Sequence, residues 1–413
     1  MKLKSNKRQE SKKNKDMKSI NDVNFKEKKV LLRVDFNVPL NERKEITDDT
    51  RMRESMPTIK KLLNDGAALI IMAHFGRPKK GGFEEEFSLN PVAKHLSEML
   101  GQSVMFTQDV QVDTVVGLSS NLGNGDVMLL ENIRFYPEET KGDIGFAEKL
   151  AKLGDAYVND AFGSAHREHA STATIARFFP NDKYFGFLME SEVKNLEKLM
   201  HNPKKPFTAI VGGSKVSSKI DILKNLAPIV DNIIIGGGMT YTFLKAMGIS
   251  IGTSICEEDK VELAKELMKD MEKNNTKLIL PIDHIIADKF SNDAKTRTTT
   301  DQSIPDGFMG MDIGDKSIEM FKNIILDSKT ILWNGPMGVF EMSSFAKGTF
   351  AIAEYIAKAT KQGAFSAVGG GDSVAAINQS GFAKDVSYIS TGGGAMLEYL
   401  EGKVLPGIKA IID

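Results

Sequence analysis

The chain has little cysteine and no long apolar run. Cys256 is the single cysteine in 413 residues, so an internal disulfide and a metal site built from several cysteines are both excluded. One thiol in a chain of this length fits a reducing compartment, and we expect a cytoplasmic protein. No stretch approaches the roughly 18 consecutive apolar residues that a membrane span requires, so we expect no membrane segment.

The chain also has almost no net charge. Lys and Arg number 54 against 55 Asp and Glu, a formal charge of −1, which gives no overall attraction to nucleic acid. We therefore expect no nucleic-acid partner. The arginines are unevenly distributed, however, since nine of the ten precede residue 178 and only Arg297 lies beyond it. Arginine can hold carboxylate or phosphate through two parallel hydrogen bonds, so the N-terminal half is the expected place of a small-anion site.

Length and pattern predict two domains of the α/β class. A chain of 413 residues exceeds what one hydrophobic core usually organises. Short apolar runs ending in glycine or polar turns alternate with helical patterns, which predicts two doubly wound, Rossmann-like parallel sheets. We expect a disordered lysine-rich extension at 1–16, an N-terminal domain at 17–187, a connecting helix at 188–203 and a C-terminal domain at 204–393.

The expected strands can be read directly from the sequence. Those of the first half are KKVLLRVDFNV, AALIIMAHFG, DVMLLENIRF and DAYVNDAFG, and the helices MPTIKKLLNDG and LNPVAKHLSEMLG are each closed by glycine. Those of the second half are FTAIVGG, NIIIGGG, TKLILPIDHIIA, TILWNGP, AFSAVGGG and VSYISTGGG.

The usual nucleotide fingerprints are missing, because neither G-x-G-x-x-G nor G-x-x-x-x-G-K-[ST] occurs. Four strands of the second half nevertheless end in glycine clusters, at 212–213, 236–238, 369–371 and 392–394. A single such turn is as often a steric requirement as a ligand site. Four on the same edge of one sheet favour a nucleotide cleft, since glycine lets main-chain N–H groups approach phosphates.

Charged and polar side chains accompany these turns. Lys215 and Lys219 are four residues apart, which predicts one face of the first turns of a helix. Two cations there oppose the helix dipole unless an anion binds; the alternative is a solvated surface pair. Asp372, before Ser373, is either an ordinary helix cap or a ligand that holds Mg²⁺ against nucleotide phosphates. Glu341 is a candidate for ribose hydroxyls, and the turn at Asn334 would bring main chain close to a ligand.

Polar residues also follow the strands of the first half. Asp35 and Asn37 flank Phe36 at the end of one strand, and His74 and Arg77 end the next. Arg51, Arg53, Arg134 and Arg167 complete the set. Each arginine alone is more often a surface charge, but Arg77, Arg134 and Arg167 all follow strand ends, where ligands of parallel sheets bind. The set is better explained as an anion pocket.

Nine motifs together resemble phosphoglycerate kinase, from about residue 18 to the C-terminus. They are RVDFNVP, HFGRP, ENIRF, NDAFGSAHREHAS, GGSKVSSK, IIIGGGM, WNGPMGVFE, GGGDS and STGGGA, in the family's order. The loop with Ser214 and Ser217-Ser218 often carries alanine and aspartate in the family, and the first 16 residues have no counterpart in it. We choose Arg51 over Arg53 because the family's arginine also stands six residues before its proline, here Pro57.

The resemblance implies a hinge-bending monomer that moves a phosphoryl group between 1,3-bisphosphoglycerate and Mg²⁺-ADP, giving 3-phosphoglycerate and ATP in glycolysis. It implies that the segment 394–413 returns to the N-terminal domain. The implied substrate-binding residues are Asp35, Phe36, Asn37, Arg51, His74, Gly76, Arg77, Arg134, Arg167 and His169. The implied nucleotide-binding residues are Gly213, Lys215, Lys219, Gly237, Asn334, Pro336, Glu341, Gly370, Gly371, Asp372 and Ser373, with Asp372 on the metal.

The chemistry of this reaction needs no general base. The carboxylate of 3-phosphoglycerate is already ionised at neutral pH, so catalysis reduces to positioning and charge neutralisation. The expected catalytic groups are Arg51, Lys215, Lys219 and the main-chain N–H groups at Gly371 and Gly393. Within HREHAS, Arg167 is the expected anion ligand, His169 is a second candidate, and His166 is structural.

Two other function classes fit parts of the sequence. A nicotinamide-dependent oxidoreductase would share the sheets and glycine turns, but its glycine fingerprint is missing. A two-domain binding protein that closes on a small anion would have no reason to place paired lysines on glycine turns. Phosphoryl transfer from ATP to 3-phosphoglycerate distinguishes both from a kinase.

Overall fold

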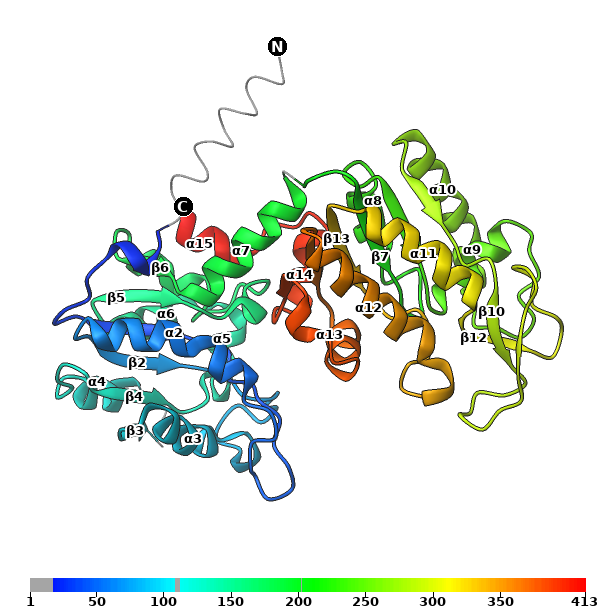
Figure 1. Cartoon of the computed structure of the whole chain (residues 1–413). Helices are drawn as coiled ribbons and strands as arrows, with labels where there is room; N and C mark the ends of the chain where they lie inside the picture. The colour runs from blue at the N-terminus through cyan, green and yellow to red at the C-terminus, as the bar shows by residue number, and fades with distance from the viewer. Residues whose placement is uncertain (1–17, 108–111, 202) are drawn as a thin grey trace, which may run out of the picture. The chain divides into compact units, whose positions relative to one another are not determined.

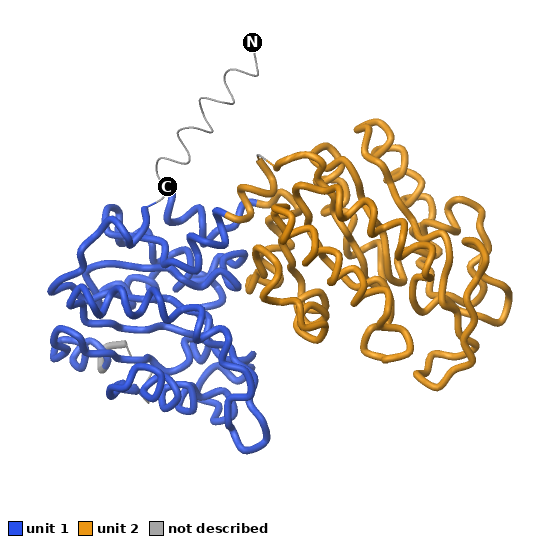
Figure 2. Tube along the Cα trace, in the orientation of Figure 1, with its two compact units in different colours: residues 1–194, 404–413 blue, residues 195–403 orange. Residues whose placement is uncertain are grey.

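The computed structural model describes residues 18–107, 112–201 and 203–413. The chain forms two compact units (Figure 2): unit 1 comprises residues 1–194 and 404–413, and unit 2 residues 195–403. The extension expected at 1–16 lies outside the described residues. Among the described residues, no helix combines the length and the apolar character that a membrane span needs.

Unit 1 is built on a six-stranded parallel sheet of order β3-β4-β2-β1-β5-β6 (Figure 1). Its strands are β1 (Lys29–Arg33), β2 (Ala68–Met72), β3 (Val104–Thr107), β4 (Val127–Leu130), β5 (Ala156–Asn159) and β6 (Lys183–Phe185). The chain runs outward from β1 in one direction and from β5 in the other, so the topological switch point lies between β1 and β5. Ligands of such sheets bind at the carboxyl ends of the strands near that point.

The helices of unit 1 are α2 (Thr50–Asn64), α3 (Asn90–Leu100), α4 (Val112–Ser119), α5 (Pro137–Lys141), α6 (Ile144–Ala151), α7 (Phe187–Met200, which continues into unit 2) and α15 (Pro406–Ile412). Short 3-10 turns are η1 (Ile20–Asp22), η2 (Glu85–Phe87), η3 (Ile133–Phe135), η4 (Phe162–Ser164) and η5 (Thr174–Phe178). Asp143 caps α6 by accepting the Phe146 N–H at 2.7 Å, and Gly101 ends α3 with a left-handed φ of 66°.

The sequence missed two strands here, β3 and β6. Both are edge strands: β3 is only partly buried, and β6 has three residues and begins with Lys183, so neither reads as a buried apolar run. The helix expected from Met56 begins at Thr50 instead, which places Arg51 in its first turn.

Unit 2 has a second six-stranded parallel sheet, of order β15-β14-β13-β7-β8-β9, with its switch point between β7 and β13. Its strands are β7 (Phe207–Val211), β8 (Asn232–Ile235), β9 (Lys277–Ile279), β13 (Thr330–Asn334), β14 (Phe365–Val368) and β15 (Tyr388–Ile389). The helices are α8 (Ile220–Leu226), α9 (Met239–Ala246), α10 (Val261–Lys273), α11 (Asp315–Asp327), α12 (Lys347–Lys361), α13 (Gly371–Gln379) and α14 (Gly394–Leu400), with 3-10 turns η6 (Glu258–Lys260), η7 (Ser343–Phe345) and η8 (Ala383–Asp385).

A small antiparallel sheet of unit 2 was not expected. It has the order β11-β10-β12 and consists of β10 (His284–Ala287), β11 (Thr296–Thr298) and β12 (Met309–Ile313). TKLILPIDHIIA was predicted as one strand, and that prediction was wrong: the chain leaves the parallel sheet after Ile279, just before Pro281, and re-enters a different sheet as β10. Proline has no N–H for a ladder, so it favours such a break.

The last twenty residues divide between the units. The helix α14 contacts α8 within unit 2. Residues 404–413 belong to unit 1, where the Gly407 N–H donates to the Ala165 carbonyl at 2.8 Å and Lys183 Nζ donates to the Ala410 carbonyl at 2.8 Å. We expected residues 394–413 to return to the N-terminal domain. Only 404–413 belong to unit 1, because α14 stays with unit 2.

Candidate active-site residues

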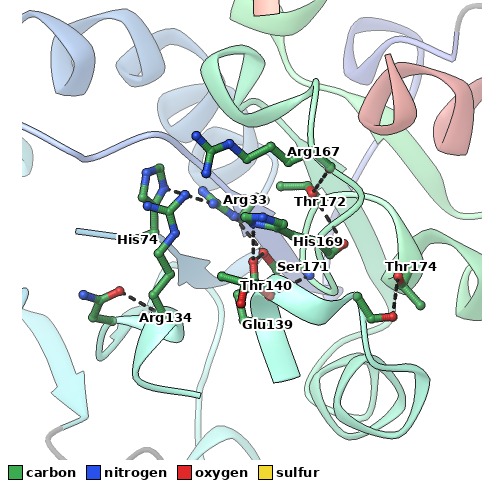
Figure 3. Close-up of polar contacts among 12 residues, drawn as sticks. Arg33, His74, Arg134, Glu139, Thr140, Arg167, His169, Ser171, Thr172 and Thr174 are labelled. Carbon is green, nitrogen blue, oxygen red and sulfur yellow. Dashed lines mark hydrogen bonds and ion pairs between the residues drawn. The ribbon is translucent and has the colours of Figure 1, made fainter. Parts of the chain in front are cut away.

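Five basic side chains gather at the carboxyl edge of the unit 1 sheet, and we call them the arginine cluster. Arg33 ends β1, His74 follows β2, Arg134 lies in η3 after β4, and Arg167 and His169 lie beyond β5. Figure 3 shows the guanidinium groups of Arg33, Arg134 and Arg167 turned toward one another beside the His74 ring. The sequence predicted every member except Arg33.

Arg33 is fully buried and organises the cluster. Its Nε donates to Ser171 Oγ at 2.9 Å, Nη2 lies 3.1 Å from His74 Nδ1, and Nη1 donates to the Val34 carbonyl. An arginine inside VLLRVDF was a signal, because a cation in a buried strand needs partners that the strand itself does not supply. Arg33, which the sequence analysis did not predict, thus connects the end of β1 to the segments that carry His74 and Ser171.

His74 is a neutral hydrogen-bonding group. Burial is the main cause that holds its pKa well below the usual value, and the charges of Arg33 and Arg134 add to the effect. A guanidinium only donates, so Nδ1 accepts from Arg33 and the ring proton is assigned to Nε2. His74 can therefore donate one hydrogen bond to an anion.

Arg134 and Arg167 give the cluster its excess of positive charge. Arg134 Nη1 donates to the Gly76 carbonyl at 2.9 Å, whereas its buried Nε finds no hydrogen-bond partner in the part of the chain that the structure describes. Burial lowers the Arg134 pKa to about 10, helped by the neighbouring charges of Arg33 and Arg167. Arg167 Nε donates to His166 Nε2 at 3.1 Å. Positive charges that lower the pKa of a neighbouring arginine favour an anion between them.

Glu139 is the buried carboxyl next to this charge. Burial raises its pKa, opposed by Arg33 and by hydrogen bonds from Ser171, whose Oγ and N–H donate at 2.7 and 2.9 Å. His169 Nδ1 lies 3.7 Å from Glu139 Oε1 and makes no hydrogen bond to any described residue. Burial lowers the His169 pKa to about 3, so this ring is neutral as well.

A second set of predicted residues lies where α2 approaches the end of β1. Arg51 Nη1 donates to Asp35 Oδ2 at 2.7 Å, the Asn37 N–H donates to Asp35 Oδ1 at 3.2 Å, and the Gly76 N–H donates to Asn37 Oδ1 at 2.8 Å. Gly76 has a left-handed φ of 59°, and a Cβ there would stand 2.3 Å from the Phe87 ring.

Three further residues lie outside these contacts. Arg77 is exposed and follows Gly76 directly. Arg53 is paired with Asp49 at 2.7 Å on the exposed side of α2. Phe36 is fully buried in the apolar core, so only its main chain can face a ligand.

In unit 2, glycine allows two turns to touch at the switch point. A Cβ on Gly212 would stand 2.0 Å from the Pro336 carbonyl oxygen, and one on Gly335 would stand 2.2 Å from the Gly212 oxygen. The neighbouring turns use left-handed glycines: Gly213 at φ 121°, Gly237 at 67°, Gly370 at 91° and Gly393 at 49°. All of them follow strands of one parallel sheet, so they share its carboxyl edge.

Lys219 lies at this edge. Its Nζ donates to Asn334 Oδ1, and burial lowers its pKa against the opposing charges of Asp372 and Glu401. The helix expected over Lys215 and Lys219 begins only at Ile220, so Lys219 is its non-helical N-cap and Lys215 lies in the preceding loop, exposed. The pair is therefore not on one helix face; only Lys219 is held by the fold.

The remaining nucleotide candidates surround α13. Gly371 is its first residue, Asp372 is exposed in its first turn, and Ser373 is buried with Oγ accepting the Gly335 N–H at 2.5 Å. The first amides of a helix have no intrahelical acceptor and can bind phosphate oxygens. Pro336 is buried and Glu341 exposed.

A metal ion at this edge would need oxygen ligands from a bound nucleotide and from water as well as from the protein. Over residues 18–107, 112–201 and 203–413, no group of three or more His, Cys, Asp or Glu side chains could hold an ion. The exposed Asp372 carboxylate beside the α13 amides fits a Mg²⁺ ion that takes most of its oxygens from nucleotide phosphates and water.

Two doubly wound units, one with an arginine cluster and one with glycine turns at the carboxyl edge of its sheet, fit the class of two-domain α/β phosphotransferases. The sequence model described as "Phosphoglycerate kinase" matches residues 20–403. The chain therefore belongs to the phosphoglycerate kinase family, which is glycolytic and transfers phosphoryl groups to a carboxyl acceptor.

Similar proteins agree over almost the whole length. The chain is 52% identical over 417 residues to a "Phosphoglycerate kinase" of Porphyromonas gingivalis, covering 95% of this chain and 99% of that protein. One from Nostoc punctiforme is 51% identical over 399 residues, covering 97% and 99%. The solved phosphoglycerate kinase structure from Coxiella burnetii superposes with a TM-score of 0.88 at 41% identity, covering 95% of this chain and 98% of that one. That from Pyrococcus horikoshii gives 0.79 at 31%, covering 96% and 98%.

Proposed function

We propose that this chain performs the family's reaction with glycerate ligands in unit 1 and the nucleotide in unit 2. The substrates would be 3-phosphoglycerate or 1,3-bisphosphoglycerate and ADP or ATP. The observation that carries the proposal is the arginine cluster: Arg33, Arg134 and Arg167 converge on one volume, and the nearby carboxyl, Glu139, is already bonded to Ser171. Such an excess of donors suits a doubly charged small anion.

The two histidines would act as donors rather than as bases. Their pKa values are lowered by burial and by the arginines, so neither carries charge near neutral pH. This suits a reaction in which the attacking carboxylate is already ionised. Arg51, released from Asp35 or still bonded to it, would neutralise negative charge on the transferring phosphoryl group.

The unit 2 edge would hold the nucleotide. Lys219 would neutralise the migrating phosphoryl group, with Lys215 supplying a second charge and the amides at Gly371 and Gly393 donating to its oxygens. Gly213, Gly237, Asn334, Pro336, Glu341, Gly370 and Ser373 would line the nucleotide. Asp372 would hold Mg²⁺, which, when bound, supplies neutralisation of phosphate charge.

The reaction requires the acyl phosphate and the nucleotide to come within bonding distance, so the units must close during turnover. We further propose a monomer that acts in the cytoplasm, with residues 17–187 as the glycerate domain and 204–393 as the nucleotide domain. A single partly buried thiol, Cys256, supports a reducing location.

The direct test measures ADP formation by the purified chain from ATP and 3-phosphoglycerate. We expect turnover that requires both substrates and Mg²⁺ and stops when EDTA is added. ATP consumption without 3-phosphoglycerate, or no transfer to it, would contradict the proposal.

A further inference from the structure

The helix α7 begins without a cap of its own. Gly186, the residue before Phe187, has no side chain to accept the free N–H groups of the first turn. A larger residue could not stand there, because a Cβ on Gly186 would lie 2.3 Å from Asp160 Oδ1. The cap must come from elsewhere in unit 1.

Two buried side chains supply it from other elements. Asp160, directly after β5, accepts the Met189 N–H through Oδ1 at 3.1 Å, and Thr58, in the middle of α2, accepts the Phe187 N–H through Oγ1 at 2.9 Å. Both side chains are fully buried. A carboxylate at a helix N-terminus is also favoured by the helix dipole.

The main chain of Asp160 is bonded to the main chain of Arg33, a member of the arginine cluster. Its N–H donates to the Arg33 carbonyl at 2.8 Å. The side chain of the same Arg33 contacts Ser171 and His74. Thr58 belongs to α2, the helix that also carries Arg51 two turns earlier. One residue thus separates the cluster from the first turn of α7.

The Asp160 carboxyl is not fully hydrogen-bonded, as a purely structural cap would be. Its Oδ2 is buried and accepts no hydrogen bond from the described residues. Burial raises the Asp160 pKa to about 6, opposed by the Met189 and Leu188 amides and the Thr58 hydroxyl. A buried carboxyl oxygen without a partner costs stability, so capping alone does not account for Asp160.

The boundary between the units falls within α7, after Lys194, so this helix continues from one unit into the other. We propose that Asp160 is a positioning residue that transmits occupation of the arginine cluster to the first turn of α7. The inference rests on the proposed function, because it takes the cluster as the site of 3-phosphoglycerate.

Substitution of Asp160 tests this in the full chain. We expect Asp160→Asn, which keeps an acceptor but not the charge, to lower kcat about tenfold with KM for 3-phosphoglycerate and ATP within about twofold of wild type. Thr58→Val, which removes the acceptor for Phe187, should act in the same direction and keeps the test open if Asp160→Asn fails to fold. As the control, Asp143→Asn alters the cap of α6 and should leave kcat unchanged.

Hydrogen exchange gives a second readout. In the wild type, 3-phosphoglycerate should slow exchange at the amides of 187–190 as well as in the segment 162–174 that carries Arg167. In Asp160→Asn it should still slow the segment 162–174 but no longer 187–190. A variant with wild-type kcat, with retained ligand-dependent protection of α7, or with kcat lost together with 3-phosphoglycerate binding would overturn the proposal. A wild-type chain that does not transfer phosphoryl groups to 3-phosphoglycerate would instead contradict the proposed function.

Discussion

Lys219 and Asn334 meet at the carboxyl edge of the unit 2 sheet, where the Lys219 ammonium donates to Asn334 Oδ1. Asn334 Nδ2 in turn donates to the Gly369 carbonyl at 2.7 Å, in the turn that starts α13. The lysine is thereby held beside the helix terminus that we assign to the phosphates. Burial removes water from the Lys219 ammonium and lowers its pKa. A phosphate oxygen that binds there would therefore stabilise the charged form strongly.

Removing that ammonium should stop catalysis without unfolding the chain. Lys219→Ala is expected to reduce kcat by more than about a hundredfold, the equivalent of roughly 2.7 kcal/mol of transition-state stabilisation. Steady-state kinetics measure the loss, and circular dichroism checks the fold. Lys224→Ala, an exposed lysine within α8, serves as control and should behave like the wild type. Near-normal turnover of Lys219→Ala would remove this lysine from the catalytic set.

Sequence reasoning succeeded where a residue type is required by local geometry. The glycine clusters were readable because each follows a short apolar run, and the parallel arrangement puts the ends of such runs on one edge. It failed where tertiary contacts decide. Nothing local indicates that α8 begins after Lys219 rather than before Lys215, or that the chain changes sheets near Pro281.

Arg33 and Asp160 illustrate the same limit. Both stand in segments that the sequence assigned to strands, and their partners lie 138 residues away, at Ser171, and 29 residues away, at Met189. A single sequence reports the buried charge but not which distant groups satisfy it. The function of such residues follows only from the contacts.

Arg33 should matter for stability as well as for binding. In Arg33→Met, Ser171 Oγ, the Val34 carbonyl and His74 Nδ1 lose their donor, and a buried polar group left without its partner typically costs about 1 to 3 kcal/mol. We expect a lower thermal midpoint and weaker binding of 3-phosphoglycerate, measured by thermal unfolding and isothermal calorimetry. Arg33→Lys should remain impaired, because one ammonium cannot reach Ser171, Val34 and His74 together. An unchanged midpoint in both variants would contradict the structural role.

Within HREHAS, Arg167 is expected to outrank His169. Arg167→Ala removes a permanent charge from the cluster and should weaken 3-phosphoglycerate binding by about one to two orders of magnitude, in line with a charge-assisted bond of roughly 1.5–3 kcal/mol. His169→Gln should change affinity by less than about threefold, equally at pH 6 and pH 8, since the His169 pKa of about 3 keeps the ring neutral at both. Calorimetric titration gives both affinities, with Arg53→Ala on the exposed side of α2 as the control. The opposite ranking would make His169 the principal ligand.

Asp312 should make the stability of unit 2 fall as pH rises. Its Oδ1 accepts the Ile313 N–H and its Oδ2 accepts the Gly348 N–H, both at 2.8 Å, beneath the start of α12. Burial raises the Asp312 pKa to about 7, opposed by these amides and by Lys347 of α12, while Tyr241 of α9 faces it without charge.

The sign follows from proton binding. Between the unfolded value near 4 and the folded pKa of about 7, the folded carboxyl holds a proton that the unfolded one releases. The stabilisation is therefore complete below about pH 4 and is lost as pH rises through 7. Asp312→Asn mimics the protonated group at every pH, so the thermal midpoint of wild type relative to this variant should fall between pH 5 and pH 8. The expected change in unfolding free energy is roughly 1–4 kcal/mol, because each tenfold difference in proton affinity between the folded and unfolded carboxyl corresponds to about 1.4 kcal/mol. A difference that stays constant across this range, or that grows with pH, would show that Asp312 is ionised throughout.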